Sequence, residues 1–168
     1  MTNTMPRLKP LSRAAVPAAL EKAERYRLLN EPWEAVSICQ DILAVEPGHH
    51  LAQVTLLLSL TDQLLEEPAA AGRAQEVARS LADEYDRLYY TGIVAERSAK
   101  AHLRRGGVSP DGLYEWLTDA MDCYERAEAI RPAGNDDAIL RWNACARLLM
   151  ENPNLQPVAE RPEPQFLE

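Results

Sequence analysis

The histidines are the first residues to test for chemistry, because imidazole is a common metal ligand and general base. His49 and His50 are sequence neighbours. On a helix they point about 100° apart, so they cannot chelate an ion as an i, i+4 pair would. His102 lies far from both in the sequence. We therefore expect histidines at helix termini or on the surface, and no metal site.

The cysteines also lack the spacing that their chemistry needs. Cys39, Cys123 and Cys145 are odd in number and widely separated, and no CxxC pair occurs. A disulfide framework needs an even count and a zinc site usually needs paired cysteines. We expect three small core residues in a reducing compartment, which predicts a cytoplasmic protein.

The most concentrated polar motif is Gly134-Asn135-Asp136-Asp137. It lacks the regularly spaced oxygens and the final Glu of a calcium loop. The simpler interpretation is a turn at Gly134, a helix cap at Asn135 and two acids that favour the helix N-terminus. An alternative stays open, in which Asp136, Asp137 and Glu96 join the histidines in a small helical enzyme or metal-binding protein. Our leading hypothesis is a protein that is not an enzyme and holds no cofactor.

Composition predicts an all-α chain. Ala and Leu are abundant, aromatic residues make up 6%, and strand-type runs are missing. Breakers and apolar periodicity predict seven helices. They cover about 16–29, 32 to before Pro47, 49–65, 69–86, 87–105, 110–130 and 135–150. No clear breaker separates the fourth from the fifth, so one continuous helix is the alternative there.

The two ends of the chain differ from this helical middle. We expect a flexible leader at 1–13, a helical domain at 14–150 and a proline-rich disordered tail at 151–168. The net charge of −8 disfavours nucleic acid and anionic membrane surfaces as partners. No stretch approaches the roughly 18 apolar residues of a membrane span.

Two segments repeat each other at fixed spacing. Ala35-x3-Cys39-x2-Ile42-x4-Pro47 has the same intervals as Ala120-x3-Tyr124-x2-Ala127-x4-Pro132. This pattern resembles the second helix of a tetratricopeptide repeat, in which a small residue marks a close helix crossing. The resemblance covers about 16–150, and a chance pair of helix hairpins is the alternative. It implies a right-handed superhelix of about three antiparallel hairpins plus a C-terminal capping helix.

The resemblance also implies where a partner binds. Tetratricopeptide arrays take extended peptides on a concave face that the first helix of each hairpin lines. The matching residues here are Glu24, Arg27, Leu28, Leu51, Leu58, Tyr89, Ile93, Arg97, Asn143 and Arg147. The alternative for Glu96 and Arg97 is that they form intramolecular ion pairs. The two-carboxylate clamp of chaperone-binding members is absent, because Leu20, Glu24, Thr55, Asp86 and Tyr90 stand at its positions.

Two functional hypotheses follow. The leading one is a scaffold or adaptor that binds a protein or peptide partner along this face. The alternative is a self-associating structural protein, with Trp33 and Trp116 available for a homo-oligomer. Phe166 and Leu167 in the tail are candidates for an internal ligand of the groove.

Overall fold

The computed structural model describes residues 5–155 and 157. Within them the chain is all-helical, with seven α-helices, one short 3-10 helix and no strand, which confirms the predicted class. The chain forms two compact units, Met1–Ala82 and Asp83–Glu168. Each is a packed set of helices and is described by itself.

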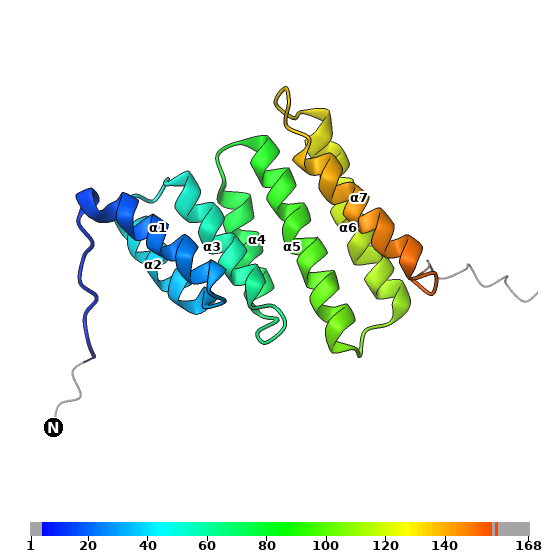
Figure 1. The fold of residues 1–168 in the computed structure, drawn as a ribbon, viewed down its shortest axis with the longest axis horizontal. Helices are drawn as coiled ribbons and strands as arrows, with labels where there is room; N and C mark the ends of the chain where they lie inside the picture. Colours follow the sequence, from blue (N-terminus) through cyan, green and yellow to red (C-terminus); the bar gives the residue numbers. More distant parts are fainter. Residues whose placement is uncertain (1–4, 156, 158–168) are drawn as a thin grey trace, which may run out of the picture. The chain divides into compact units, whose positions relative to one another are not determined.

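The first unit contains η1 (Arg13–Ala15), α1 (Val16–Leu28), α2 (Pro32–Val45), α3 (His50–Asp62) and α4 (Ala70–Ser80) (Figure 1). Each of these α-helices packs on the next one in sequence, and α1 also contacts α3. The first core cluster is centred on Val16, Ile42 and Ala52. Ala23, Ala35 and Cys39 are completely buried, as the small residues of a close helix crossing should be.

The ends of these helices follow from local chemistry. Asn30 adopts a positive φ of 60° directly after α1, and Asn tolerates this left-handed conformation better than most residues. Pro32 occupies the first turn of α2, where its missing N–H costs nothing. His49 caps α3, since its Nδ1 accepts the Ala52 N–H at 3.2 Å. The prediction of a histidine at a helix terminus is thus confirmed.

The second unit contains α5 (Glu84–Arg105), α6 (Pro110–Ala129) and α7 (Asp137–Glu151) (Figure 1). α6 packs on both α5 and α7, with the more extensive contact to α5. Ser109 caps α6 by accepting the Gly112 N–H at 3.3 Å. Asn135 Oδ1 accepts the Asp137 N–H at 3.0 Å, but the N-cap residue of α7 is Asp136, so the predicted cap lies one residue too early. The helix itself starts two residues later, at Asp137.

The boundary between the fourth and fifth helices differs from the prediction. α4 ends at Ser80 rather than Asp86, and residues 81–83 separate two distinct helices. Asp83 has extended backbone and its carboxylate accepts the Asp86 N–H at 3.2 Å, so it begins α5 as an N-cap. The alternative of one continuous helix, which rested on the lack of a clear breaker, is therefore wrong, and buried Leu81 and Tyr85 continue the apolar pattern across the break.

The predicted leader and tail are described only in part. Residues 5–12 are not helical, and Leu11 packs on the first core cluster. At the other end Leu155 is buried, and Asn152 Nδ2 donates to the Leu148 carbonyl at 2.8 Å. Residues 156 and 158–168 of the predicted tail, including Phe166 and Leu167, lie outside the described residues.

Candidate functional site

A buried glutamate lies at the centre of the second unit. The Glu96 side chain is 0% exposed, and its carboxylate connects all three helices of this unit. From α6 the Tyr124 hydroxyl donates to Oε2 at 2.6 Å. From α5 itself Lys100 donates to Oε1, and from α7 Arg141 Nη1 approaches the same oxygen at 3.4 Å. A buried carboxylate is tolerable only with such partners, because an isolated charge would be strongly disfavoured.

The two cations of this cluster extend to the surface. The side chains of Lys100 and Arg141 are 39% and 33% exposed. Burial alone would lower the pKa of Arg141, but the Glu96 carboxylate and the Tyr89 hydroxyl outweigh it and raise that pKa. Arg141 is therefore a permanent cation held between the buried carboxylate and the solvent.

A row of tyrosines lies beside these cations on α5. Tyr85 and Tyr89 are stacked with their ring centroids 5.8 Å apart, and Tyr89 meets Tyr90 edge to face at 5.1 Å. Tyr89 also lies 5.9 Å from the Tyr124 ring and hydrogen-bonds Arg141. Burial is the main cause that raises the pKa of Tyr89, and it raises that of Tyr90 to about 12. These phenols remain neutral hydrogen-bonding groups at any physiological pH.

Helical spacing explains why these groups meet. Tyr85 and Tyr89 are four residues apart, as are Glu96 and Lys100, so each pair shares a helix face. Between them stands Gly92, where a Cβ would lie 2.6 Å from Tyr124 Cε1. The missing side chain therefore lets the Tyr124 ring reach α5 and Glu96. At the N-terminal end the Tyr85 hydroxyl donates to Asn135 Oδ1 at 3.4 Å, which ties α5 to the start of α7.

The predicted partner-binding residues of the second unit differ in how far they are exposed to solvent. Tyr89 belongs to the cluster just described, while Arg97 and Asn143 are partly exposed and Arg147 is exposed. Ile93 is almost completely buried, so its side chain packs inside rather than offering a contact surface. The ion pairs proposed as the alternative role of Glu96 are confirmed by Lys100 and Arg141.

The predicted residues of the first unit lie on or near α1 and α3. Leu28 and Leu51 are exposed, Glu24 is exposed, and Leu58 is partly buried. Arg27 Nε forms an ion pair with Asp62 Oδ2 at 2.6 Å, which joins the last turns of α1 and α3. The described residues of the first unit, from Met5 on, form no aromatic and cationic cluster of the kind found around Glu96.

The sequence did not predict the cluster that Glu96, Lys100 and Arg141 form. The sequence suggests for Glu96 a contact on the partner-binding face, an intramolecular ion pair or a place in a metal or catalytic site, and it indicates no role for Lys100. Their partners are Tyr124 and Arg141, which are remote in sequence. The i, i+4 spacing of Glu96 and Lys100 was the one local signal available.

The metal-site alternative gains no support from the geometry. Among the described residues no group of three or more His, Cys, Asp or Glu side chains could hold an ion. Asp136 instead pairs with Arg131 Nε at 3.2 Å. His102 packs on Trp116 with ring centroids 4.6 Å apart.

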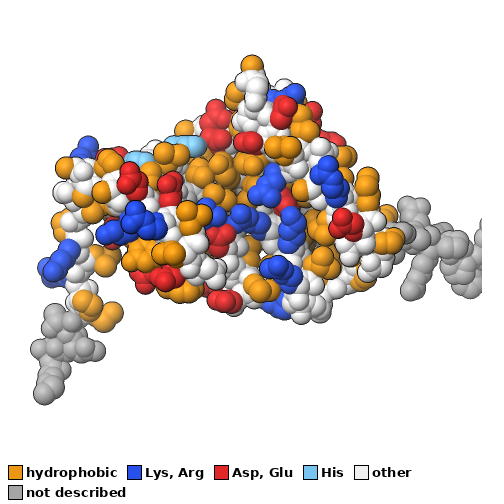
Figure 2. All heavy atoms as spheres, viewed as in Figure 1, with side chains coloured by type: hydrophobic (Ala, Val, Ile, Leu, Met, Phe, Trp, Pro, Cys, Tyr) orange, Lys and Arg blue, Asp and Glu red, His pale blue; other side chains and the backbone are white. Residues whose placement is uncertain are grey.

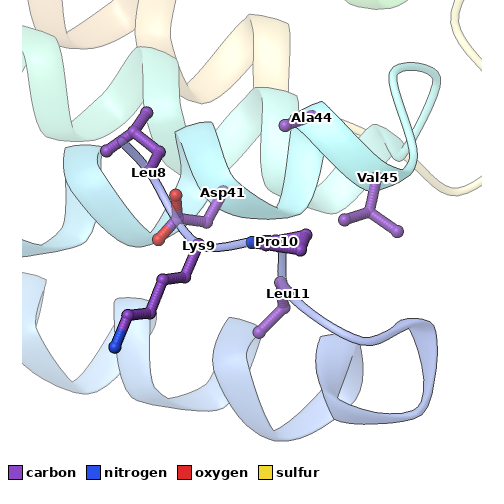
Figure 3. A pocket seen from close by; sticks show the side chains of 7 residues that line it. All are labelled: Leu8, Lys9, Pro10, Leu11, Asp41, Ala44 and Val45. Carbon is purple, nitrogen blue, oxygen red and sulfur yellow. The ribbon is translucent and has the colours of Figure 1, made fainter. Parts of the chain in front are cut away.

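A second surface feature lies in the first unit. Residues Leu8–Leu11 cross the outside of α2 and enclose a pocket of about 240 Å³ with Asp41, Ala44 and Val45 (Figure 3). A neighbouring pocket of about 310 Å³ shares Leu11 and Asp41 and extends toward α1. Both are mainly apolar and open, and neither gathers groups that could do chemistry.

The comparisons with known proteins add no relative. The chain matched no protein-family model, no curated protein and no solved structure. Within the part of the chain that the structure describes, no helix is both long and apolar enough to span a membrane.

Proposed function

We propose that this chain is a protein-binding adaptor whose α5–α7 surface takes an extended segment of a partner protein. The observation that carries the proposal is the tyrosine row on α5 beside two half-exposed cations fixed by Glu96. Tyr and Arg are the residues most enriched in binding hot spots, because they offer large contact areas together with hydrogen bonds. Side chains already held by packing and ion pairs lose little entropy when a partner binds.

We further propose that the hairpins form a tetratricopeptide-type array, with the superhelix that this class implies. Two contacts support it. In the first unit, Arg27 and Asp62 join the same ends of the first and third helices. In the second unit, Tyr85 and Asn135 do the same for α5 and α7. Parallel first helices of successive hairpins are what such an array requires.

The binding proposal can be tested by site-specific photocrosslinking in cells. A benzophenone amino acid in place of Tyr90 should capture a discrete partner, while the same probe at exposed Glu115 on α6 should not. Arg141→Gln should weaken the Tyr90 capture several-fold, and Arg126→Gln on α6 should leave it unchanged. Equal capture at both positions, or at neither, would count against a binding face on α5–α7.

One observation favours self-association as a second candidate. Leu28, Leu29 and Trp33 at the α1–α2 turn are 88%, 61% and 52% exposed, which is unusual for large apolar side chains so close in sequence. This candidate predicts a sedimentation coefficient that rises with protein concentration and a monomer when Trp33 is replaced by Ala. A concentration-independent monomer for the native chain would eliminate it.

A further inference from the structure

We propose that Lys100 and Arg141 form a subsite for a carboxylate side chain, Asp or Glu, in the partner segment. The inference rests on the proposed function, because it names the chemistry that the α5–α7 surface recognises. It differs from the terminal-carboxylate clamp of chaperone-binding arrays, whose positions on α5 hold Asp86 and Tyr90.

The two cations keep unused hydrogen-bond donors. A Lys ammonium has three N–H groups and an Arg guanidinium has five. Lys100 donates one to Glu96, and Arg141 uses Nη1 on Glu96 and one further contact on Tyr89. The side chains of Lys100 and Arg141 are 39% and 33% exposed, so both can be reached from the solvent. Because both approach the same Glu96 oxygen, they lie close enough together for one further carboxylate.

The local charge favours a carboxylate over a phosphoryl group. One buried anion, Glu96, faces two cations, which leaves a single positive charge at the surface. A carboxylate neutralises this excess, whereas a phosphate dianion would overfill it. Asp86 and Asp137 act on the Tyr90 phenol and repel any anion bound nearby, and this repulsion is larger for a phosphate dianion than for a carboxylate.

The distribution of charged side chains along α5 also favours an acidic partner. The chain is acidic, yet the segment Glu96–Arg105 carries four basic side chains and one acid. Figure 2 shows Lys and Arg side chains gathered over the middle and C-terminal part of α5. An acidic partner segment is therefore attracted to this part of the surface and repelled by much of the rest.

The tyrosine row adds a preference for an apolar neighbour. Tyr89 contacts Arg141 directly, and its ring lies between Tyr85 and Tyr90. In an extended peptide, residues two apart point to the same side and lie about 7 Å from each other. A segment with an aromatic or aliphatic residue two positions from an acid matches this arrangement.

The test uses the full chain and three capped tripeptides followed by NMR. The first probe is acetyl-Phe-Ser-Glu-amide. In the second probe Gln replaces the Glu, and in the third phosphoserine replaces it. We expect the Glu peptide to shift the Arg141 side-chain and Tyr89 ring signals in a saturable manner. The Gln peptide should bind at least about 10-fold more weakly, the cost of one charge-assisted contact. The phosphoserine peptide should bind no more tightly than the Glu peptide.

Variants locate the effect. Lys100→Gln should weaken the Glu peptide several-fold while leaving the Arg141–Glu96 pair to hold the fold, and Arg126→Gln should change nothing. Equal binding of the Glu and Gln peptides, or a loss with Arg126→Gln as large as with Lys100→Gln, would overturn the subsite. Tighter phosphoserine binding would replace it with a phosphate site. Partner capture through position 90 is a separate readout, so the subsite can fail while the proposed function stands.

Discussion

Glu96 is the residue on which the second unit most depends. Replacing it by Gln keeps its shape but removes the charge that Lys100 and Arg141 share. We expect the free energy of unfolding to fall by about 2–4 kcal/mol, the range for breaking a buried, hydrogen-bonded ion pair. Urea denaturation followed by circular dichroism measures this loss. Glu115→Gln on the exposed side of α6 is the control and should change it by less than about 0.5 kcal/mol.

Gly92 makes a second prediction at the same scale. Alanine favours helices over glycine by about 1 kcal/mol, so Gly→Ala inside a helix normally stabilises it. At position 92 the new methyl would lie 2.6 Å from Tyr124 Cε1 and 2.9 Å from Cδ1, and that ring is completely buried. We expect Gly92→Ala to destabilise the chain by about 1–3 kcal/mol.

Gly72 provides the matched control for this substitution. It lies inside α4, and a Cβ there would meet nothing within 4 Å. Gly72→Ala should therefore stabilise by about 0.5–1 kcal/mol. Thermal denaturation of both variants compares the signs directly. If both substitutions raised the melting temperature, the Tyr124 ring would be able to move aside without a cost in stability.

At the scale of the elements, the sequence predicted helices well and one boundary poorly. Asn30 ends α1 and Ser109 caps α6, roles that their residue types favour, because capping depends on a few neighbouring atoms. The α4–α5 boundary was placed wrongly because Leu81 and Tyr85 continue the apolar pattern through a non-helical turn. The residue type of Asp83 indicated the true boundary, because Asp is a typical N-cap residue at the start of a helix.

The cap at Asp83 can be tested by substitution. Asp83→Ala removes the acceptor of the Asp86 N–H and a favourable charge at the N-terminus of α5. We expect a loss of about 1 kcal/mol in stability, with Asp83→Asn recovering most of it. Hydrogen exchange should show faster exchange in the first turn of α5 and little change near Glu96. An unchanged first turn would mean that packing alone fixes where α5 starts.

The tyrosines of the second unit predict sensitivity to alkali. The pKa values of Tyr85, Tyr89, Tyr90 and Tyr124 are all raised, chiefly by burial. A raised folded-state pKa means that the stabilising contribution is complete below the unfolded value near 10 and is lost as pH rises above it. At about pH 11 the folded chain should show less tyrosinate absorbance at 295 nm than the chain in guanidinium. Equal absorbance with helical content intact would contradict this.

At the scale of the whole molecule, the sequence predicted an all-helical chain, and the described residues form the seven expected α-helices, because composition and periodicity act over many residues. It did not identify the Glu96 cluster, because that depends on which side chains from distant helices converge. It also did not anticipate two compact units, since the helical pattern continues across residues 81–83. Which side chains meet, and where the chain divides into compact units, both depend on tertiary packing, which a local sequence pattern does not encode.

Two buried cysteines allow the stability of the two units to be measured separately. Cys39 in the first unit and Cys145 in the second are completely buried. Burial, followed by a nearby glutamate, raises both thiol pKa values to about 12. Alkylation requires the thiolate, so near neutral pH each thiol should react only when its own unit opens. Pulsed alkylation across a urea series, read by mass spectrometry, then gives one midpoint for each unit.

The contacts of Glu96 predict how these two midpoints respond to mutation. The ion-pair and hydrogen-bond partners Lys100, Tyr124 and Arg141 of Glu96 lie in the second unit. Glu96→Gln should therefore lower the urea midpoint of Cys145 more than that of Cys39. Leu57→Ala, which empties part of the first unit's interior, should do the reverse. Equal shifts at both cysteines for both variants would mean that the units unfold in a single cooperative transition, as neighbouring repeats do when the coupling between them exceeds their own stability.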